Sequence, residues 1–356
     1  MFFIKATGPI PLSVRKNYDI LNSYTFYDLN MDEQILIKFK QAWDKIKNAN
    51  NIFLVTHYNP DGDGLSSVCA MIELLKLQEK KFFAYCFDEP PRTFDFLPNL
   101  EKINFHSDQP VTDFYKHDLI LVFDCGSLSR TKLDKEISEK ETGQFVIEFD
   151  HHPKIDNYSD LEIRNSRAAA TAEIVYYFFK ANQIRINKNI ANCLLTGILT
   201  DTANFLYPAT SDATIKISSE LLSMGAKLPQ ITESTLRNKS LEAMKLWGKI
   251  MANLQINLNY NFAITALTLE DIDGLDIKNE ELEGLSNFLG NLYGVKAVML
   301  LREETKGILK GNLRTADPTI DLSKLAQKLG GGGHTKAAGF SMEGHLEKTE
   351  KGWKVI

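Results

Sequence analysis

The chain has 356 residues, which is more than one ordinary hydrophobic core organises, and this length predicts two domains. Its 44% hydrophobic and 24% charged residues are typical of a soluble globular protein. A net charge of −5 excludes a surface that coats long duplexes, so we expect nucleic-acid contact only at a local basic patch.

Cysteine usage and hydropathy bear on the compartment. The four cysteines form no Cys-x-x-Cys pair and have apolar neighbours, so we expect reduced core thiols at Cys69, Cys86, Cys125 and Cys193. No run approaches the roughly 20 apolar residues of a membrane helix, and the start of the chain lacks the layout of a signal peptide. The expected location is the cytoplasm, without membrane contact.

The chain begins with a segment that has no clear pattern. Residues 1–30 contain Pro9 and Pro11 and no sustained periodicity, so we expect an irregular arm. From Asp32 onward, apolar residues recur on one helical stripe and predict a first helix; they are Ile35, Phe39, Trp43 and Ile46.

Beyond this helix, short apolar runs typical of buried strands alternate with helical patterns. The predicted strands are 52–55, 119–123 and 145–149, and the predicted helices are 66–77, 171–180 and 190–199. Such alternation implies a parallel sheet covered on both faces. We therefore predict an α/β fold for this part of the chain.

A second, smaller α/β domain is predicted after a helical stretch. Residues 218–247 are helical in pattern, with breaks at Gly225 and Pro229. Alternating apolar runs then predict strands, at 262–267, 295–301 and 308–314. We place the first domain at 31–225, a helical connector at 226–247 and the second domain at 248–356.

Acids and imidazoles gather where the predicted strands and helices end. The segments are His57-Tyr58-Asn59-Pro60-Asp61-Gly62-Asp63, Asp124, Asp150-His151-His152 and Thr200-Asp201. We expect them to converge, because open α/β sheets bind ligands at the carboxyl ends of their strands; Asp201 would arrive from the end of a helix. Carboxylates mixed with imidazoles suit two divalent cations of the Mn²⁺ or Mg²⁺ type. Turn chemistry and helix capping explain each segment alone, but not the joint set.

A glycine run near the C-terminus is the second motif. Gly330 to Gly333 are followed by His334, between a helical pattern at 322–329 and a small-residue segment at 335–340. A flexible linker would usually continue in Gly or Ser. Bare backbone N–H groups can approach a phosphate closely, and His334 and Lys336 add charge or donors. We therefore predict phosphate recognition by this segment.

Together these motifs resemble the DHH phosphoesterase superfamily, in the branch that carries a DHHA1 domain. The chain is most similar to the type that combines oligoribonuclease and phosphoadenosine-phosphate phosphatase activities, over about residues 32 to 343. The marks are the segments above, together with Thr196 to Thr202 and Gly331 to Phe340. The resemblance implies a parallel-sheet DHH domain with flanking helices, a smaller α/β DHHA1 domain, and metal-dependent phosphoester hydrolysis.

The resemblance also implies a set of metal ligands. One Mn²⁺ would be bound by His57, Asp61 and Asp124, and the second by Asp63, Asp124, His151 and Asp201. Asp124 would bridge the two ions, and Mg²⁺ or Co²⁺ would be possible substitutes. Two such cations, about 3.5–4 Å apart, acidify a water and clamp the phosphoryl oxygens during in-line attack.

The substrate-facing residues are implied in the same way. His152 would lie beside the scissile phosphate, so that Asp124 and His152 are the catalytic residues. The second domain would bind substrate phosphate through Arg314, Gly332, Gly333 and His334. The implied substrates are short single-stranded RNA, linear dinucleotides such as pApA, and 3′-phosphoadenosine-5′-phosphate, which fit the motifs equally.

Departures and alternatives stand beside this interpretation. Ala203 replaces a common family glycine, and residues 165–171 are less serine-rich than usual, which would alter the pocket but removes no ligand. Family II pyrophosphatases have a different C-terminal domain, RecJ-type exonucleases lack the equivalent of His57, and membrane-anchored cyclic-dinucleotide phosphodiesterases have apolar helices. An enzyme for other short single-stranded nucleic acids is one alternative. A catalytically silent nucleotide-binding protein is another, although here every ligand position is filled.

Overall fold

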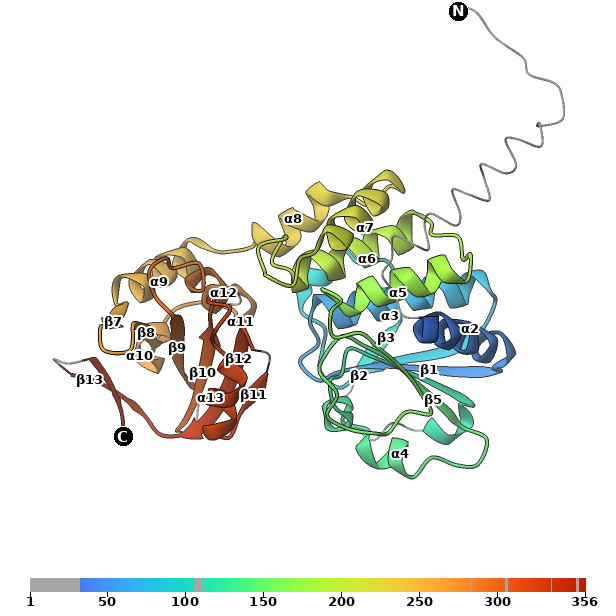
Figure 1. Cartoon of the computed structure of the whole chain (residues 1–356), viewed down its shortest axis with the longest axis horizontal. Helices are drawn as coiled ribbons and strands as arrows, with labels where there is room; N and C mark the ends of the chain where they lie inside the picture. The colour runs from blue at the N-terminus through green and yellow to red at the C-terminus, as the bar shows by residue number, and fades with distance from the viewer. Residues whose placement is uncertain are drawn as a thin grey trace, which may run out of the picture.

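The chain folds into two lobes that lie side by side in Figure 1. A computed structural model describes residues 33–105, 111, 113–282, 284–304, 307–333, 335–349 and 352–356. The predicted N-terminal arm and His334 lie outside the described residues. Within the described part, no helix is both long enough and apolar enough to cross a membrane.

The first lobe is built on a parallel sheet of six strands in the order β3-β2-β1-β4-β5-β6. The strands are β1 (Asn51–Thr56), β2 (Lys81–Cys86), β3 (Ile103–Phe105), β4 (Leu119–Phe123), β5 (Phe145–Asp150) and β6 (Leu161–Arg164). Strand order reverses direction between β1 and β4. In open α/β sheets such a switch point opens a crevice at the carboxyl ends of the strands.

Alternate side chains of the central strands bury on opposite faces of this sheet. Ile52 and Leu54 belong to the larger core beneath the long helices α2 (Glu33–Asn48), α3 (Gly62–Leu77), α5 (Thr171–Ala181) and α6 (Lys188–Asp201). Phe53 and Val55 belong to a smaller core on the other face. That face is covered by short elements, namely η3 (Phe114–Lys116), η4 (Leu128–Thr131) and α4 (Asp134–Ser138). The turns η1 (Arg92–Phe94) and η2 (Leu100–Lys102) lead into β3.

Three helices lead from the first lobe to the second. They are α7 (Asp212–Ser223), α8 (Leu228–Leu236) and α9 (Leu241–Ala252), and Figure 1 shows the chain crossing between the lobes from α8 to α9. Leu246 and Ile250 of α9 pack on the core of the second lobe.

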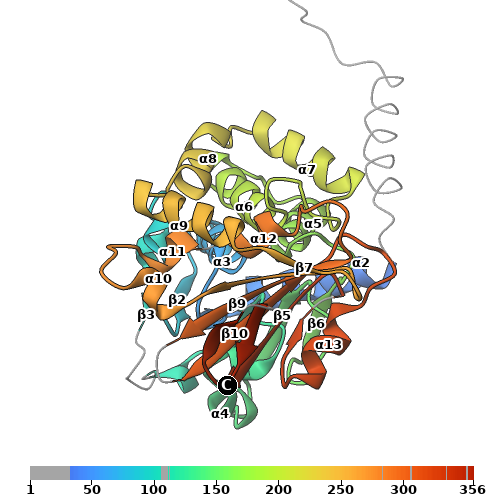
Figure 2. The same ribbon diagram turned by 90° about the vertical axis from the view of Figure 1, so that its left-hand side faces the viewer.

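The second lobe carries a mixed sheet in the order β11-β12-β10-β9-β8-β7, in which only the β8–β9 pair is parallel. Its strands are β7 (Gln255–Asn257), β8 (Phe262–Leu267), β9 (Ala297–Glu304), β10 (Ile308–Arg314), β11 (Gly332–Gly333) and β12 (Ala337–Glu343). The short helices are α10 (Leu269–Ile272), α11 (Asn279–Leu282), α12 (Leu285–Leu289) and α13 (Leu322–Lys328). Figure 2 shows α9 and α12 along one side of this sheet and α13 along the other. A hairpin of β13 (Leu346–Thr349) and β14 (Gly352–Val355) completes the lobe.

The structure confirms the predicted parallel α/β sheet and the second α/β domain. Helix α3 begins at Gly62 instead of the predicted Ser66, because Asp61 caps its N-terminus. The four cysteines are free and buried, as expected for core thiols.

Candidate active site

The predicted ligand segments meet at the switch point of the first sheet. His57 follows the last residue of β1, Asp124 follows the last residue of β4, and these two strands are neighbours in the sheet. His151 follows the next strand, β5, and Asp201 is the last residue of α6. Parallel strands and one helix end therefore bring together side chains that lie far apart in the sequence.

The loop between β1 and α3 is shaped by its N-cap and by two close approaches. The Asp61 carboxylate accepts hydrogen bonds from the backbone N–H groups of Asp63 and Gly64, both at 3.1 Å. A Cβ atom on Gly62 would lie 2.4 Å from Oγ1 of Thr200, and one on Gly64 would lie 2.3 Å from Oγ1 of Thr56. The two glycines therefore let α3 pack directly against α6 and the end of β1.

Asp124 is held in a left-handed conformation, with φ of +60°. Such a φ is uncommon outside glycine, and residues of this kind gather at functional sites where the surroundings hold them. The backbone N–H of Asp124 donates to the carbonyl of Phe149 at 2.9 Å, and the Thr171 hydroxyl donates to Oδ1 at 2.9 Å. Tertiary contacts thus aim the carboxylate into the cluster.

Asp63 is oriented by the N-terminus of α5. Its two carboxylate oxygens accept hydrogen bonds from the backbone N–H groups of Thr171 and Ala172, at 2.6 and 2.9 Å. These are unpaired donors of the first helical turn, which favour a negative charge. The sequence predicted a helix from Thr171, but nothing in it linked that helix to Asp63.

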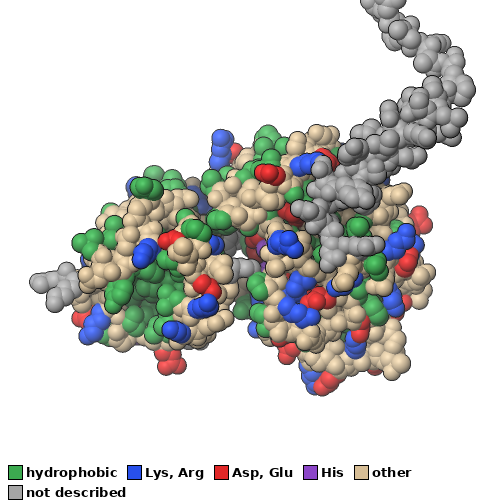
Figure 3. Space-filling model, in the orientation of Figure 1, with side chains coloured by type: hydrophobic (Ala, Val, Ile, Leu, Met, Phe, Trp, Pro, Cys, Tyr) green, Lys and Arg blue, Asp and Glu red, His purple; other side chains and the backbone are tan. Residues whose placement is uncertain are grey.

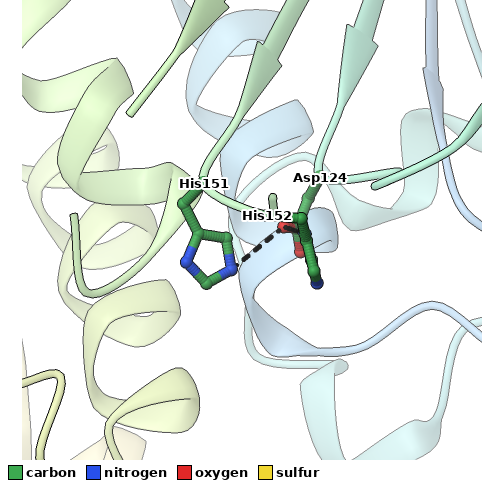
Figure 4. Close-up of side chains that lie close together, drawn as sticks. All are labelled: Asp124, His151 and His152. Carbon is green, nitrogen blue, oxygen red and sulfur yellow. Dashed lines mark ion pairs between the residues drawn. The ribbon is translucent and has the colours of Figure 1, made fainter. Parts of the chain in front are cut away.

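The acids and imidazoles form three tight groups, in each of which the ligand atoms lie within 4.8 Å of one another: His57, Asp61 and Asp124; Asp63, His151 and Asp201; and Asp124, His151 and His152. Nε2 of His57 lies 3.5 Å from Oδ1 of Asp61 and 3.9 Å from Oδ2 of Asp124. Figure 4 shows His151 pointing at Asp124, with Nε2 at 3.5 Å from Oδ1. Nε2 of His151 is also 3.5 Å from Oδ2 of Asp201.

The donor set fits divalent cations. Nδ1 of His57 lies 2.8 Å from the Tyr58 carbonyl, an acceptor, which assigns the ring proton to Nδ1. In the neutral imidazole this leaves a lone pair on Nε2, a buried atom that has no hydrogen-bond partner among the described residues. A buried imidazole nitrogen that has no hydrogen-bond partner and faces two carboxylates is suited to bind a metal ion.

Electrostatics indicate the same need for positive charge. Burial raises the pKa of Asp63 well above its usual value, and the charges of Asp124 and Asp201 raise it further. Burial also raises the pKa of Asp201 to about 7. Carboxylates packed this closely cannot all ionise in a low dielectric unless cations compensate them.

His152 sits at the rim of the cluster, on Asp150. Its Nδ1 lies 2.9 Å from Oδ1 of Asp150 and 3.4 Å from Oδ1 of Asp124. Burial lowers the pKa of this imidazole, but hydrogen bonds to Asp124 and Asp150 outweigh it and raise that pKa to about 11. Asp150 thus orients His152, a function that the motif alone did not assign.

Comparison with known proteins places the chain in a family. The DHH family N-terminal domain matches residues 51–198, and the DHHA1 domain matches residues 259–355. The chain belongs to the DHH family. It is a phosphoesterase of the group with a C-terminal DHHA1 domain, as the motifs predicted.

Two curated relatives share most of this architecture. The bifunctional oligoribonuclease and PAP phosphatase NrnA of Thermus thermophilus is 30% identical over 82% of this chain and 84% of the relative. The protein of the same name from Bacillus subtilis is 28% identical over 82% of this chain and 90% of the relative. Among solved structures, an exopolyphosphatase-related protein from Bacteroides fragilis superposes with a TM-score of 0.78 and 25% identity, covering 85% of this chain and 90% of that one.

The predicted substrate residues of the DHHA1 domain lie on the second sheet. Arg314 ends β10; its Nε donates to Oδ1 of Asn287 at 2.6 Å and its Nη1 donates to the Leu313 carbonyl at 2.8 Å. The guanidinium also lies near the Tyr207 hydroxyl of the first lobe, where it opposes the burial that raises the pKa of Tyr207. Arg314 therefore lies on the side of its lobe that is near Tyr207. Figure 3 shows a seam between the two lobes.

The glycine run has mainly a packing reason in this structure. A Cβ on Gly331 would lie 2.1 Å from the Gly339 carbonyl oxygen, and one on Gly333 would lie 2.7 Å from the Ala337 carbonyl oxygen. Gly330 and Gly332 have no atom within 4 Å of that position, and Gly330 has a left-handed φ of +77°. Close approach to β12 explains Gly331 and Gly333, and the positive φ explains Gly330. Gly332 has neither of these reasons to be glycine.

The segment after Asp201 contains Ala203, which stands where the family resemblance predicted glycine. Ala203, Asn204 and Phe205 are consecutive left-handed residues, with φ of +48°, +58° and +70°. Glycine adopts this region without a steric penalty, whereas alanine does not. Ala203 therefore stands at a backbone position that favours glycine, the residue that the family resemblance led us to expect there.

Proposed function

We propose that this DHH-family protein hydrolyses phosphoesters in short oligoribonucleotides and small nucleotides, using two bound divalent cations. The observation that carries the proposal is the buried, unpartnered Nε2 of His57, aimed at Asp61 and Asp124. The names of the Thermus and Bacillus relatives support oligoribonuclease and PAP phosphatase activity.

The proposed first metal set is His57, Asp61 and Asp124, and the second is Asp63, Asp124, His151 and Asp201. Mixed imidazole and carboxylate ligands favour Mn²⁺ over Mg²⁺, which prefers oxygen ligands and retained water. When bound, the cations would acidify an attacking water and neutralise the phosphoryl oxygens. Asp124 would be the shared ligand, and its left-handed backbone would aim it between the two sets.

His152 is proposed to act on the scissile phosphate. Its Nδ1 is occupied by Asp150, so the opposite ring nitrogen, Nε2, is the one that would meet substrate. There it would donate a hydrogen bond to a phosphoryl oxygen or a proton to the leaving oxygen. In this proposal His152 contacts the substrate phosphate and does not bind a metal ion.

The second lobe is proposed to select short substrates. Arg314, Gly332, Gly333 and His334 would hold a terminal phosphate while the scissile bond lies at the acid cluster. A guanidinium held by Asn287 is pre-organised for a charge-assisted contact with phosphate. Holding one end of the substrate at the seam limits the substrate length that reaches the cluster.

Two further points stay predictions. The domain boundaries are placed at residues 225 and 247. The four free, buried thiols support a cytoplasmic location.

A substrate panel tests the proposal. Mn²⁺-loaded protein should turn over 3′-phosphoadenosine-5′-phosphate, pApA and RNA of a few nucleotides, and should leave a long duplex intact. The matched control is Asp124→Ala on the same substrates. Full Mn²⁺ occupancy without turnover of any of them would contradict the proposal. If bis-p-nitrophenyl phosphate is not cleaved either, the result would favour a silent nucleotide-binding protein.

A further inference from the structure

Behind His152 lies a buried arginine that belongs to none of the family motifs in this chain. Arg164 is the last residue of β6, and its side chain is only 8% exposed. Its donors point in three directions. Nε donates to Oε1 of Glu162 at 3.1 Å, Nη1 donates to the His152 carbonyl at 2.6 Å, and Nη2 donates to Oε1 of Glu148.

Sheet register explains why these charges meet. Glu148 and Asp150 are two residues apart on β5, so their side chains lie on one face. Glu162 and Arg164 are their direct partners on β6, in the pairs Glu148–Glu162 and Asp150–Arg164. The Tyr158 hydroxyl also donates to Oε1 of Glu148 at 2.7 Å. One guanidinium therefore serves three carboxylates beside the cluster.

Arg164 reaches the substrate-facing imidazole by two routes. The first is direct, through the hydrogen bond to the backbone carbonyl of His152. The second passes through Asp150, whose Oδ2 lies 3.5 Å from Nη1 of Arg164. Oδ1 of Asp150 accepts from the backbone N–H of His152 at 2.8 Å and contacts Nδ1 of the ring at 2.9 Å. Both the backbone and the ring of His152 thus depend on groups that Arg164 holds.

We propose that Arg164 is a positioning residue for the reaction, which holds the backbone and the imidazole of His152 in the orientation that meets the scissile phosphate. The inference rests on the proposed function, because it takes His152 as the substrate-facing group. Among the described residues, the hydrogen bonds and ion pairs of Arg164 join it to none of the six proposed metal ligands, so its effect would pass through Asp150 and His152.

Arginine chemistry makes this function specific. A guanidinium presents five N–H donors in a rigid fork, whereas a lysine ammonium is a single point charge on a flexible stem. Lysine can neutralise Glu148, but it cannot hold Glu148, Glu162 and the His152 carbonyl together. Arg164→Lys therefore keeps the charge and loses the geometry, which makes it the informative variant. Arg164→Met, which also leaves buried carboxylates unpaired, is the harsher one.

The first test separates positioning from binding in steady-state kinetics. Supporting groups of this kind typically contribute about 10- to 100-fold to activity. Arg164→Lys should lower kcat by that factor, with KM changed by less than about threefold and Mn²⁺ content unchanged. Glu220→Gln is the control, since Glu220 of α7 accepts from Tyr176 and Lys180, which lie on α5 of the same lobe. A wild-type kcat in Arg164→Lys, or a loss of Mn²⁺ that accounts for the defect, overturns the proposal.

A double-mutant cycle supplies the second test. If Arg164 acts through the His152 side chain, the effect of Arg164→Lys should shrink to less than about threefold in a His152→Ala background. An undiminished loss in that background shows that Arg164 supports the lobe and not the imidazole. Melting temperatures of all four proteins identify any variant that simply unfolds. If a variant of the His152→Ala background unfolds, the kinetics of the Arg164→Lys single variant decide the proposal.

The third test needs no turnover. In metal-free protein labelled with ¹⁵N-histidine, the ring nitrogens of His152, assigned by loss of their signals in His152→Ala, should shift in Arg164→Lys, while those of His117 stay unchanged. Unshifted His152 nitrogens contradict the proposal.

Failure of the proposed function can be told apart from failure of this inference. If wild-type protein does not turn over phosphorylated dinucleotides but cleaves bis-p-nitrophenyl phosphate, the substrate proposal fails. The double-mutant cycle of Arg164 and His152 can still be measured on that ester.

Discussion

The two lobes differ in how their functional groups are assembled. The DHH lobe gathers its acids and imidazoles from β1, β4, β5 and α6, and packs them so closely that burial and neighbouring charges raise the pKa of Asp63 and Asp201. The DHHA1 lobe offers Arg314 at the end of β10 and a glycine pair on β11, which β12 separates from β10. The first arrangement is a cluster of carboxylates and imidazoles that fits metal cations, whereas the second offers a guanidinium and backbone N–H groups that suit phosphate. This contrast predicts a division between chemistry and substrate selection.

Removal of the metal should have the largest effect on activity, because both proposed cations act directly in the reaction. This change affects the DHH lobe and leaves the DHHA1 lobe intact. Protein stripped with a chelator should lose activity on every substrate, and Mn²⁺ should restore it best. The measurement is turnover of pApA and of bis-p-nitrophenyl phosphate across a concentration series of each ion. Equal or better rescue by Mg²⁺ counts against the assigned ligand chemistry.

Asp124→Ala should come next. The change removes a carboxylate that faces both His57 and His151, so the two cations would lose their shared ligand and repel one another. Activity should fall by several orders of magnitude on all substrates, and inductively coupled plasma mass spectrometry should find fewer than two Mn²⁺ per chain. A variant that keeps both ions and at least a tenth of wild-type turnover would show that Asp124 is not the bridge.

Arg314→Ala tests the other side of the comparison. Loss of a charge-assisted phosphate contact, about 1.5–3 kcal/mol, should lower kcat/KM roughly 10- to 150-fold on phosphorylated dinucleotides, with metal content intact. The loss should be much smaller on bis-p-nitrophenyl phosphate, which has no terminal phosphate for the second lobe. Equal losses on both substrates, for Arg314→Ala and for His334→Ala, would abolish the proposed division.

Substitution of one close-packed glycine in each lobe should have the smallest effects. In the DHH lobe, a Cβ on Gly197 would lie 2.6 Å from Cβ of Ala172 and 2.8 Å from Oδ1 of Asp63; in the DHHA1 lobe, one on Gly311 would lie 2.1 Å from Cζ of Phe340. Both Gly→Ala variants should lower the free energy of unfolding by about 1–3 kcal/mol through overpacking. Only Gly197→Ala should also weaken Mn²⁺ binding, because only it displaces a proposed ligand.

Gly248→Ala is the matched control for these variants. Gly248 lies within α9, and no atom lies within 4 Å of a Cβ placed there. Alanine should therefore be neutral or stabilising by about 0.5–1 kcal/mol in thermal unfolding. Weaker Mn²⁺ binding by Gly311→Ala as well would mean that the two lobes are not separable in this respect.

The sequence by itself determined the elements that carry the site. Strand β4 and the first residue of α5 match their predicted limits, because an apolar run and a helical pattern are local signals. The acids and imidazoles were found for a similar reason, since their spacing around strand ends forms motifs that can be read along the chain. The glycine run was also recognisable along the chain, whereas Arg314 was predicted only through the family resemblance.

Tertiary structure alone decided how these groups are held. The N-terminus of α5 on Asp63, the left-handed turn at Asp124 and the register that sets Arg164 against Glu148 and Asp150 all join segments that lie far apart in the sequence. The mixed pairing of the second sheet likewise depends on which strands meet, and not on their composition. Such contacts arise from packing between distant residues, for which a single sequence carries no local periodic signal.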